Sequence, residues 1–218
     1  MMPGCGGALI APRLFLTASH CVREPDGVTA APDTIAVTFQ PDGRSSAGRV
    51  AVESILVHPQ ADPSRWAFIN DVAVIVLAEP QAATAYRLPG SVVLGAMDLR
   101  GVSFDLVGYG ATANRQGTGK PGVQFLDQRQ AATAPFQSLT PTFLNLLENT
   151  RQTDEGGACY SDSGSPVLLP GQEVVYAVTT GGNAICRSTA QKPRLDVPVV
   201  RDWLLEVLSR HGGGVANR

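Results

Sequence analysis

Short apolar runs alternate with turn residues along most of the chain. The first half holds five such runs, rich in Val, Ile, Leu, Phe, Ala and Thr, at residues 8–11, 14–18, 34–39, 49–57 and 72–77. Turn sequences such as Pro25-Asp26-Gly27 separate them. Apolar runs of this length between turn signals predict β-strands.

A second set of runs follows at residues 102–107, 123–129, 165–169, 173–179 and 195–197. Because no helical periods lie between the runs, they favour an antiparallel barrel or sandwich over βαβ units. Two segments differ. Residues 140–149 could form a short helix, and residues 199–210 repeat apolar positions at helical spacing before a glycine run ends the pattern. The polar segment 111–121 predicts a surface loop.

Composition excludes several classes of protein. The chain has 218 residues, of which 17% are charged and 44% hydrophobic, which argues against disorder. A formal net charge of −2 without a basic stripe argues against nucleic acid as a partner. No apolar run approaches the roughly 18 residues that cross a membrane. The first residues lack a signal-peptide pattern, which taken alone indicates a cytoplasmic protein.

The four cysteines, at positions 5, 21, 159 and 186, leave two readings open. Their grouping, one pair in each half, suggests two disulfides and an oxidising compartment. The alternative is four buried free thiols, since free cysteine behaves as a small hydrophobe. No C-x-x-C pair is present, so we expect no zinc site from these residues.

Three side chains are candidates for chemistry. Among the histidines, His58 and His211 are expected at the surface, whereas His20 ends an apolar strand beside a cysteine. Ser163 lies between small residues and glycine, surroundings that leave a hydroxyl exposed to an incoming carbonyl. Asp71 begins a very apolar strand, and a buried carboxylate there needs a partner such as histidine.

Several segments together resemble the chymotrypsin/trypsin family of serine proteases. CGGALI at 5–10 and LTASHC at 16–21 are similar to the family's "CGGxLI…LTAAHC", and VHP at 57–59 with NDVAVI at 70–75 to its "VHP…NDIALL". GYG at 108–110 resembles "GWG", and CYSDSGSP at 159–166 resembles "CxGDSGGP". The order His20, Asp71, Ser163 and the separations of 51 and 92 positions also fit this family.

The resemblance implies an all-β fold of two antiparallel six-stranded β-barrels, at about residues 1–98 and 99–197, with a C-terminal helix at about 199–210. The active site would lie between the barrels and use no cofactor and no metal. It implies disulfides Cys5–Cys21 and Cys159–Cys186.

The resemblance also implies a catalytic role for each residue. Ser163 is the nucleophile, His20 the general base and then acid, and Asp71 the residue that orients His20. The backbone N–H groups of Ser161 and Ser163 form the oxyanion hole.

The residues expected to bind substrate surround the nucleophile in the family. They are Gly157, Ala158, Tyr160, Thr179, Thr180 and Gly181. Gly157 stands at the floor of the primary pocket, where a trypsin-like enzyme has aspartate, so an apolar or mid-sized substrate side chain is expected rather than Lys or Arg. In a different loop register, Asp154 or Glu155 could supply a charge there.

Ser161 and Ser165 replace glycines of the family pattern. In the family, the glycine that corresponds to Ser161 has a backbone conformation that side chains disfavour. If the Tyr160–Ser161 peptide flips, the oxyanion hole loses a donor worth about 2.7–4 kcal/mol.

The start of the chain also departs from the family. Family members have a strand before the CGGALI segment, and many carry a new N-terminus that pairs with the aspartate before the nucleophile, here Asp162. We therefore expect Met1 to be a misplaced start or a fragment boundary, with a signal peptide and first strand upstream, and the protein to be secreted. Without that segment Asp162 lacks its ammonium partner and the first barrel has an unpaired edge.

Two functions follow from the sequence. The first is a monomeric serine endopeptidase, with polypeptide substrates and protein protease inhibitors as its partners and no membrane partner. The alternative is a weak or inactive homologue that binds proteins, which Ser161 and the missing start favour. The intact set of His20, Asp71 and Ser163 favours the enzyme.

Overall fold

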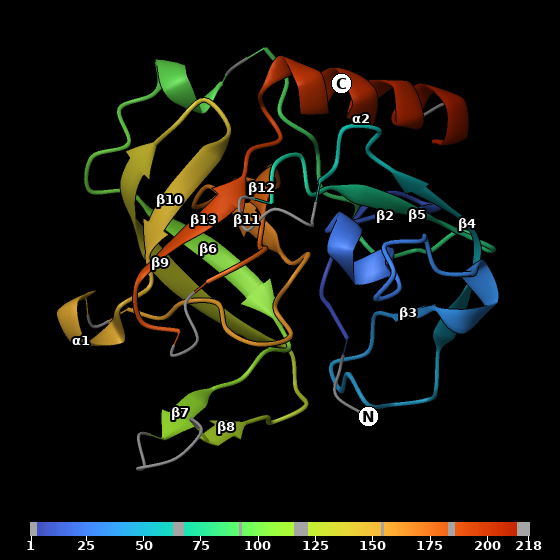
Figure 1. Ribbon diagram of the computed structural model, residues 1–218, viewed down its shortest axis with the longest axis horizontal. Helices are drawn as coiled ribbons and strands as arrows, with labels where there is room; N and C mark the ends of the chain where they lie inside the picture. The colour runs from blue at the N-terminus through green and yellow to red at the C-terminus, as the bar shows by residue number, and fades with distance from the viewer. Residues whose placement is uncertain are drawn as a thin grey trace.

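The computed structural model describes residues 4–62, 68–91, 93–115, 122–153, 155–182 and 186–212 (Figure 1). The strands are β1 (Ala8–Ala11), β2 (Leu14–Thr17), β3 (Ala36–Thr38), β4 (Arg49–Val57), β5 (Ala73–Leu77), β6 (Ser103–Gly108), β7 (Ala113–Arg115), β8 (Gly122–Gln124), β9 (Gln130–Leu139), β10 (Phe143–Leu147), β11 (Pro166–Leu168), β12 (Val175–Val178) and β13 (Thr189–Pro193). The α-helices are α1 (Thr150–Thr153) and α2 (Pro198–His211), and short 3-10 helices are η1 (Ser19–Val22), η2 (Pro32–Thr34) and η3 (Leu94–Ala96).

The strands form two main antiparallel sheets, which Figure 1 shows as two lobes with α2 lying across one side of the molecule. One sheet has the order β1-β2-β5-β4-β3 and the other β12-β11-β6-β9-β10-β13, while β7 and β8 form a separate hairpin. The predicted all-β architecture with a C-terminal helix is confirmed, and so are six strands in the second sheet.

The first sheet has five strands among the described residues, so the prediction of six is wrong for it. Within the described residues, β1 and β3 are the two edge strands of this sheet, and no ladder of hydrogen bonds joins them. A cavity of about 1190 Å³, lined by residues of both edges, lies there.

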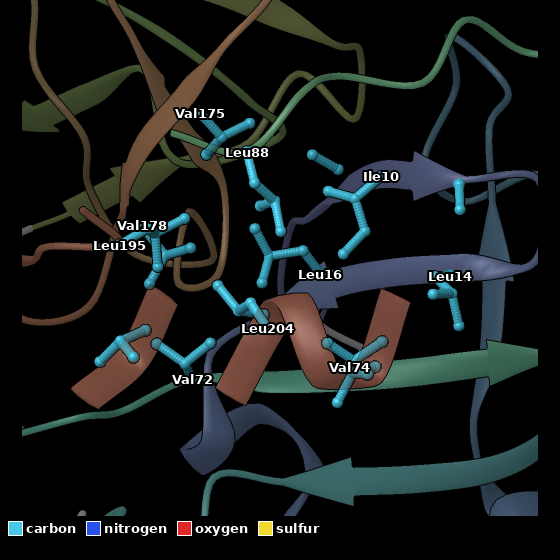
Figure 2. Close-up of a cluster of buried hydrophobic side chains, with 14 of the residues drawn as sticks. Ile10, Leu14, Leu16, Val72, Val74, Leu88, Val175, Val178, Leu195 and Leu204 are labelled. Atoms are coloured by element: carbon cyan, nitrogen blue, oxygen red, sulfur yellow. The ribbon is translucent and has the colours of Figure 1, made fainter. Parts of the chain in front are cut away.

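The two sheets and α2 share one apolar core (Figure 2). Leu16 and Val74 from the first sheet, Val178 from the second, and Leu204 from α2 are all buried in it. Burial of this apolar surface, at about 25 cal/mol per Å², fixes the sheets against each other. The helix predicted at 199–210 from its repeated apolar positions is confirmed, and α2 extends one residue beyond each predicted end. Within the described residues, no helix has both the length and the apolarity to span a membrane.

Several predicted elements are wrong. The helix expected at 140–149 is instead strand β10, which pairs with both β9 and β13. Tertiary pairing outweighs helix propensity there, because Phe143, Leu144 and Leu146 are buried in the second sheet. Residues 195–197 are not a strand, and the polar strand β13 lies before them. Of the strand predicted at 123–129, only residues 123 and 124 belong to one, at the end of β8, and β9 begins after it. Part of the predicted loop 111–121 is β7, and residues 116–121 lie outside the described residues.

His58 is buried rather than exposed, contrary to the prediction from sequence. Its Nε2 donates to the carbonyl of Val199 at 3.0 Å and its Nδ1 accepts from the N–H of Gln60 at 3.2 Å. Its ring also packs edge-on against Trp203. His58 thus ties the start of α2 to the first sheet as a neutral imidazole. His211, at the end of α2, is exposed as predicted.

This contact predicts a loss of stability at acidic pH. Burial lowers the pKa of His58 below 6.5, while its bond to Val199 opposes that shift. Because the unfolded chain then binds the proton more readily, the contribution of His58 is present above pH 6.5 and is lost as the pH falls from 6.5 through the folded pKa. The slope should reach at most about 1.4 kcal/mol per pH unit.

The measurement is the free energy of unfolding in urea at a series of pH values between about 7.5 and 5, which spans the ordinary pKa of histidine. His58→Gln is the control, since its amide can still donate to Val199 but does not titrate. An equal pH dependence in the variant and the wild type would contradict the role of His58.

Candidate active site

The loop that carries Ser163 is tied to both sheets. The N–H of Gly6, just before β1, donates to the carbonyl of Ser163 at 2.7 Å, and the N–H of Gly164 donates to the carbonyl of Thr179 at 2.6 Å. Gly164 has φ +83°, and a Cβ there would lie 2.2 Å from Thr17 Oγ1. Only glycine fits this close approach, so the sequence Ser163-Gly164 places the serine where the sheets meet.

His20 and Asp71 lie side by side on the first sheet's side of this junction. His20 belongs to η1 after β2, and Asp71 precedes β5, the strand paired with β2. His20 Nδ1 lies 2.6 Å from Asp71 Oδ2, and the His20 N–H donates to Asp71 Oδ1 at 2.9 Å. The carboxylate is fully buried while the imidazole is 27% exposed. The carboxylate thereby fixes the ring and leaves Nε2 as the atom available for proton transfer.

Ser19 is a further partner of Asp71 that sequence reasoning missed. Its buried hydroxyl donates to Asp71 Oδ1 at 2.5 Å. The signal was present, because LTASHC has serine where the family's "LTAAHC" has alanine. This bond holds the carboxylate oxygen that also accepts from the His20 N–H and leaves the other oxygen to the imidazole.

Ser163 lies beside this pair without yet being bonded to it. Its Oγ donates to the carbonyl of Thr180 at 3.4 Å, a long and weak hydrogen bond. The Nε2 of His20 contacts Cys21 Sγ at 3.8 Å. Among the described residues, no hydrogen bond joins Ser163 to His20. The structure therefore brings His20 and Asp71 together and leaves the third contact unformed.

The peptide between Tyr160 and Ser161 has a defined orientation. The carbonyl of Tyr160 accepts from the N–H of Ala111 at 3.0 Å, so the N–H of Ser161 points away from Ala111. Ser161 has φ +73°, the left-handed conformation that normally favours glycine. Within the described part of the chain, the N–H groups of Ser161 and Ser163 donate to no other protein group. Both remain able to bind an anion.

The side chain of Asp162, which lies between these two serines in the sequence, points toward the second sheet. Its carboxylate accepts from the N–H groups of Gly110 at 2.8 Å and Cys159 at 2.9 Å. Burial raises the pKa of Asp162, while the two N–H bonds and the charge of Lys192 oppose that shift. A cavity of about 210 Å³, lined by Asp162 together with small residues such as Gly108 and Ala132, lies beside it.

The residues predicted to bind substrate surround the Ser163 loop. Gly157 and Ala158 precede the disulfide-bonded Cys159, and Thr179 and Thr180 follow β12. Tyr160 is 45% exposed. Glu155 accepts from the hydroxyl of Ser103 at 2.9 Å, and this bond holds it toward β6. Asp154, the other acid considered for the pocket, lies outside the described residues.

Phe68 is a second site residue that the sequence did not reveal. Its ring lies 5.5 Å from the ring of His20, and a Cβ on Gly181 would come within 2.8 Å of it. Phe68 also has φ +43°, which is uncommon for a large side chain. Its ring therefore stands between the histidine and the predicted substrate strand, a position set only by the fold of the Phe68–Asp71 turn.

Both predicted disulfides are present. Cys5–Cys21 joins the segment before β1 to η1, directly beside His20, and Cys159–Cys186 joins the Ser163 loop to the segment before β13. Donor atoms of Cys5, His20 and Cys21 lie within 4.8 Å of one another. Because both sulfurs are in a disulfide, they cannot act as the thiolates that bind zinc.

Two facing antiparallel sheets with a C-terminal helix, and a serine loop fixed between them, define a chymotrypsin-like protein. The family model described as Trypsin matches residues 2–204, and the chain belongs to that family. The fold is similar to that of a mutant form of human heparin binding protein, with a TM-score of 0.72 at 22% identity, over 98% of this chain and 89% of that one. Another structure of human heparin binding protein gives a TM-score of 0.69 at the same identity, over 97% of this chain and 89% of that one.

Curated relatives carry protease names. Mouse serine protease 56 is 27% identical over 95% of this chain and 35% of its own length. Chymotrypsin-like elastase family member 1 of Bos taurus is 26% identical over 87% of this chain and 72% of its own length. Chymotrypsin of Phaedon cochleariae is 28% identical over 85% of this chain and 65% of its own length. The chain spans about a third of the length of the first of these relatives.

Proposed function

We propose that the chain is a serine endopeptidase that hydrolyses peptide bonds through an acyl-enzyme intermediate. The observation that carries the proposal is the fully buried Asp71 carboxylate 2.6 Å from His20 Nδ1, beside a serine loop fixed to both sheets. A buried aspartate that bonds one ring nitrogen stabilises the imidazolium formed when the other nitrogen takes a proton. A protein that only binds partners has no need of this arrangement.

In the proposed reaction, Ser163 Oγ attacks the scissile carbonyl as His20 Nε2 takes its proton. The imidazolium then gives that proton to the leaving amine, and the C–N bond breaks to leave an ester on Ser163. Water, deprotonated by His20, attacks the ester, and the proton returns to Ser163. Asp71 stays ionised throughout and orients the ring.

The step that the resting structure requires is a rotation of the Ser163 hydroxyl. Its bond to the Thr180 carbonyl is 3.4 Å long, so breaking it costs little. In the proposed reaction the Ser163 hydroxyl leaves the Thr180 carbonyl and turns toward His20. Catalytic hydrogen bonds are often loose without substrate and shorten when it binds.

The oxyanion formed in each half of the reaction would bind the N–H groups of Ser161 and Ser163. The Tyr160–Ser161 peptide supports this role, since its carbonyl is held by Ala111 and its N–H is turned the other way. The donors stay in place before the charge develops, which is the source of their effect. The substrate would lie as an extended strand along residues 179–181.

The setting proposed for this enzyme is an oxidising, extracellular compartment. Two disulfides support it, since disulfides persist in secreted proteins and are rare in the cytosol. We also propose that the protein is a monomer that acts on polypeptides and is bound by protein protease inhibitors. Its two barrel units would meet near residue 98. An ammonium group that enters the cavity beside Asp162 would neutralise its buried carboxylate.

One observation favours a second function, that of a non-catalytic homologue which binds proteins. The Ser163 hydroxyl bonds Thr180 rather than His20. If that bond persists with substrate bound, the serine keeps its proton and no acyl-enzyme forms.

Labelling with a fluorophosphonate probe separates the two functions. The enzyme should take one label, on Ser163, identified by mass spectrometry of the digested protein. Ser163→Ala should take none, and His20→Ala should label at least about a hundredfold more slowly because it lacks the base. A folded wild-type protein that takes no label on Ser163 would establish the binding homologue instead.

A further inference from the structure

A lysine and a glutamate are fully buried together at one end of the second sheet. Lys192 lies in β13 and Glu148 follows β10, two strands that run side by side in Figure 1. Lys192 Nζ is 2.8 Å from Glu148 Oε1, and the two side chains are 1% and 3% exposed. Lysine and glutamate are almost never buried this deeply unless paired. The sheet's stability does not call for them, since apolar residues of similar volume commonly do as well.

The pair lies directly under the loop that leads to the candidate nucleophile. A Cβ on Gly157 would lie 2.6 Å from Glu148 Cβ, so Gly157 rests on the glutamate side chain. The hydroxyl of Thr180 donates to the carbonyl of Gln191 at 3.2 Å, which fixes β13 beside the predicted substrate strand. The disulfide Cys159–Cys186 joins the same two segments. The Gly157 loop, the Thr180 strand and β13 therefore lie against one another beside Ser163, with the ion pair beneath Gly157.

The charges at this position cancel. Within the described residues, Glu148 is the ion-pair partner of Lys192. The other buried carboxylate nearby, Asp162, is held by the N–H groups of Gly110 and Cys159. A cationic or an anionic substrate side chain that reached the pair would be attracted by one member and repelled by the other. No net charge would then offset the cost of removing that side chain from water, so both kinds are disfavoured.

We propose that Lys192 and Glu148 form the closed, electrically neutral base of the primary specificity pocket, so that the enzyme cleaves after small uncharged side chains. This proposal rests on the endopeptidase function proposed above. It also assigns specificity to two residues other than the glycine at position 157. Removal of either charge should leave the other to select substrates of opposite sign.

The test uses three peptides that differ only in the residue before the cleaved bond, which is Ala, Glu or Lys. The wild type should favour Ala over both charged residues by at least about a hundredfold in kcat/KM. Glu148→Gln, which keeps the shape and leaves Lys192 unpaired, should raise the Glu-to-Ala ratio at least about tenfold. Lys192→Met should raise the Lys-to-Ala ratio by a similar factor.

The double variant, Lys192→Met with Glu148→Gln, is the matched control and should favour neither charge. Folded single variants that keep the wild-type ranking would overturn the proposal, as would a wild type that cleaves best after Lys or Glu. If a single variant does not fold, the wild-type ranking and the double variant decide. A wild type that takes no fluorophosphonate label and cleaves none of the peptides would instead overturn the endopeptidase function itself.

Discussion

Asp71→Asn should lower kcat by about 10⁴-fold while the protein stays folded, the loss that the serine protease mechanism assigns to this substitution. The physical reason is visible in the hydrogen bonds. Asp71 Oδ1 already accepts from Ser19 and from the His20 N–H. The asparagine oxygen would take that place and turn its NH₂ toward His20 Nδ1. That nitrogen would then accept, Nε2 would carry the proton, and His20 could not act as a base.

The measurement is kcat on a peptide substrate from about pH 6 to 10, with the melting temperature of each variant. Ser19→Ala is the matched control, since it removes one donor to the same carboxylate but leaves the His20 contact and the charge in place. It should cost less than about tenfold in kcat, in line with the loss of one hydrogen bond. If Asp71→Asn retained more than about a tenth of wild-type kcat, Asp71 would not be the residue that orients the base.

The sequence reveals these site residues because their chemistry limits which neighbours they can have. Gly164 must be glycine since Thr17 and Gly6 leave no room for a side chain, and a serine must precede it to reach the junction of the sheets. Asp71 must begin a buried strand to be shielded from water. Such constraints act over a few adjacent residues, so they survive as short strings that can be recognised. The strands of the first sheet were predictable for a similar reason, because β1, β2 and β5 are apolar on both faces.

Features that depend on distant contacts were not predictable. Strand β9 reads Gln-Ala-Ala-Thr-Ala-Pro-Phe-Gln-Ser-Leu, which lacks a strong apolar pattern and is a strand because it pairs along β6 and β10. Lys192 looks like a surface residue until β10 brings Glu148 beside it. Phe68 meets His20 and Gly181 only because its turn has the left-handed conformation. In each case the neighbour that decides the role lies far away along the chain.

For Ser161 the sequence and the structure each supply a part. The sequence shows a serine where the family has glycine, which puts an oxyanion-hole donor at risk, and the structure gives the conformation of this serine. A serine at φ +73° carries a strain of order 1 kcal/mol that glycine avoids. The strain is maintained because Ala111 holds the Tyr160 carbonyl and the Cys159–Cys186 disulfide anchors the start of the loop. Strain kept at a site by its surroundings indicates that the conformation is needed there.

Ser161→Pro should therefore lower kcat by about 10²–10³-fold, because proline removes the N–H donor and cannot adopt a positive φ. Ser161→Gly is the comparison at the same position. It keeps the donor, relieves the strain and should retain at least wild-type kcat. The measurement is kcat on one peptide for both variants, with melting temperatures to show that each is folded. A folded proline variant as active as the wild type would mean that the oxyanion is held by other groups. If the proline variant does not fold, Ser161→Val replaces it, since a β-branched side chain disfavours positive φ and should flip the peptide with the N–H still present.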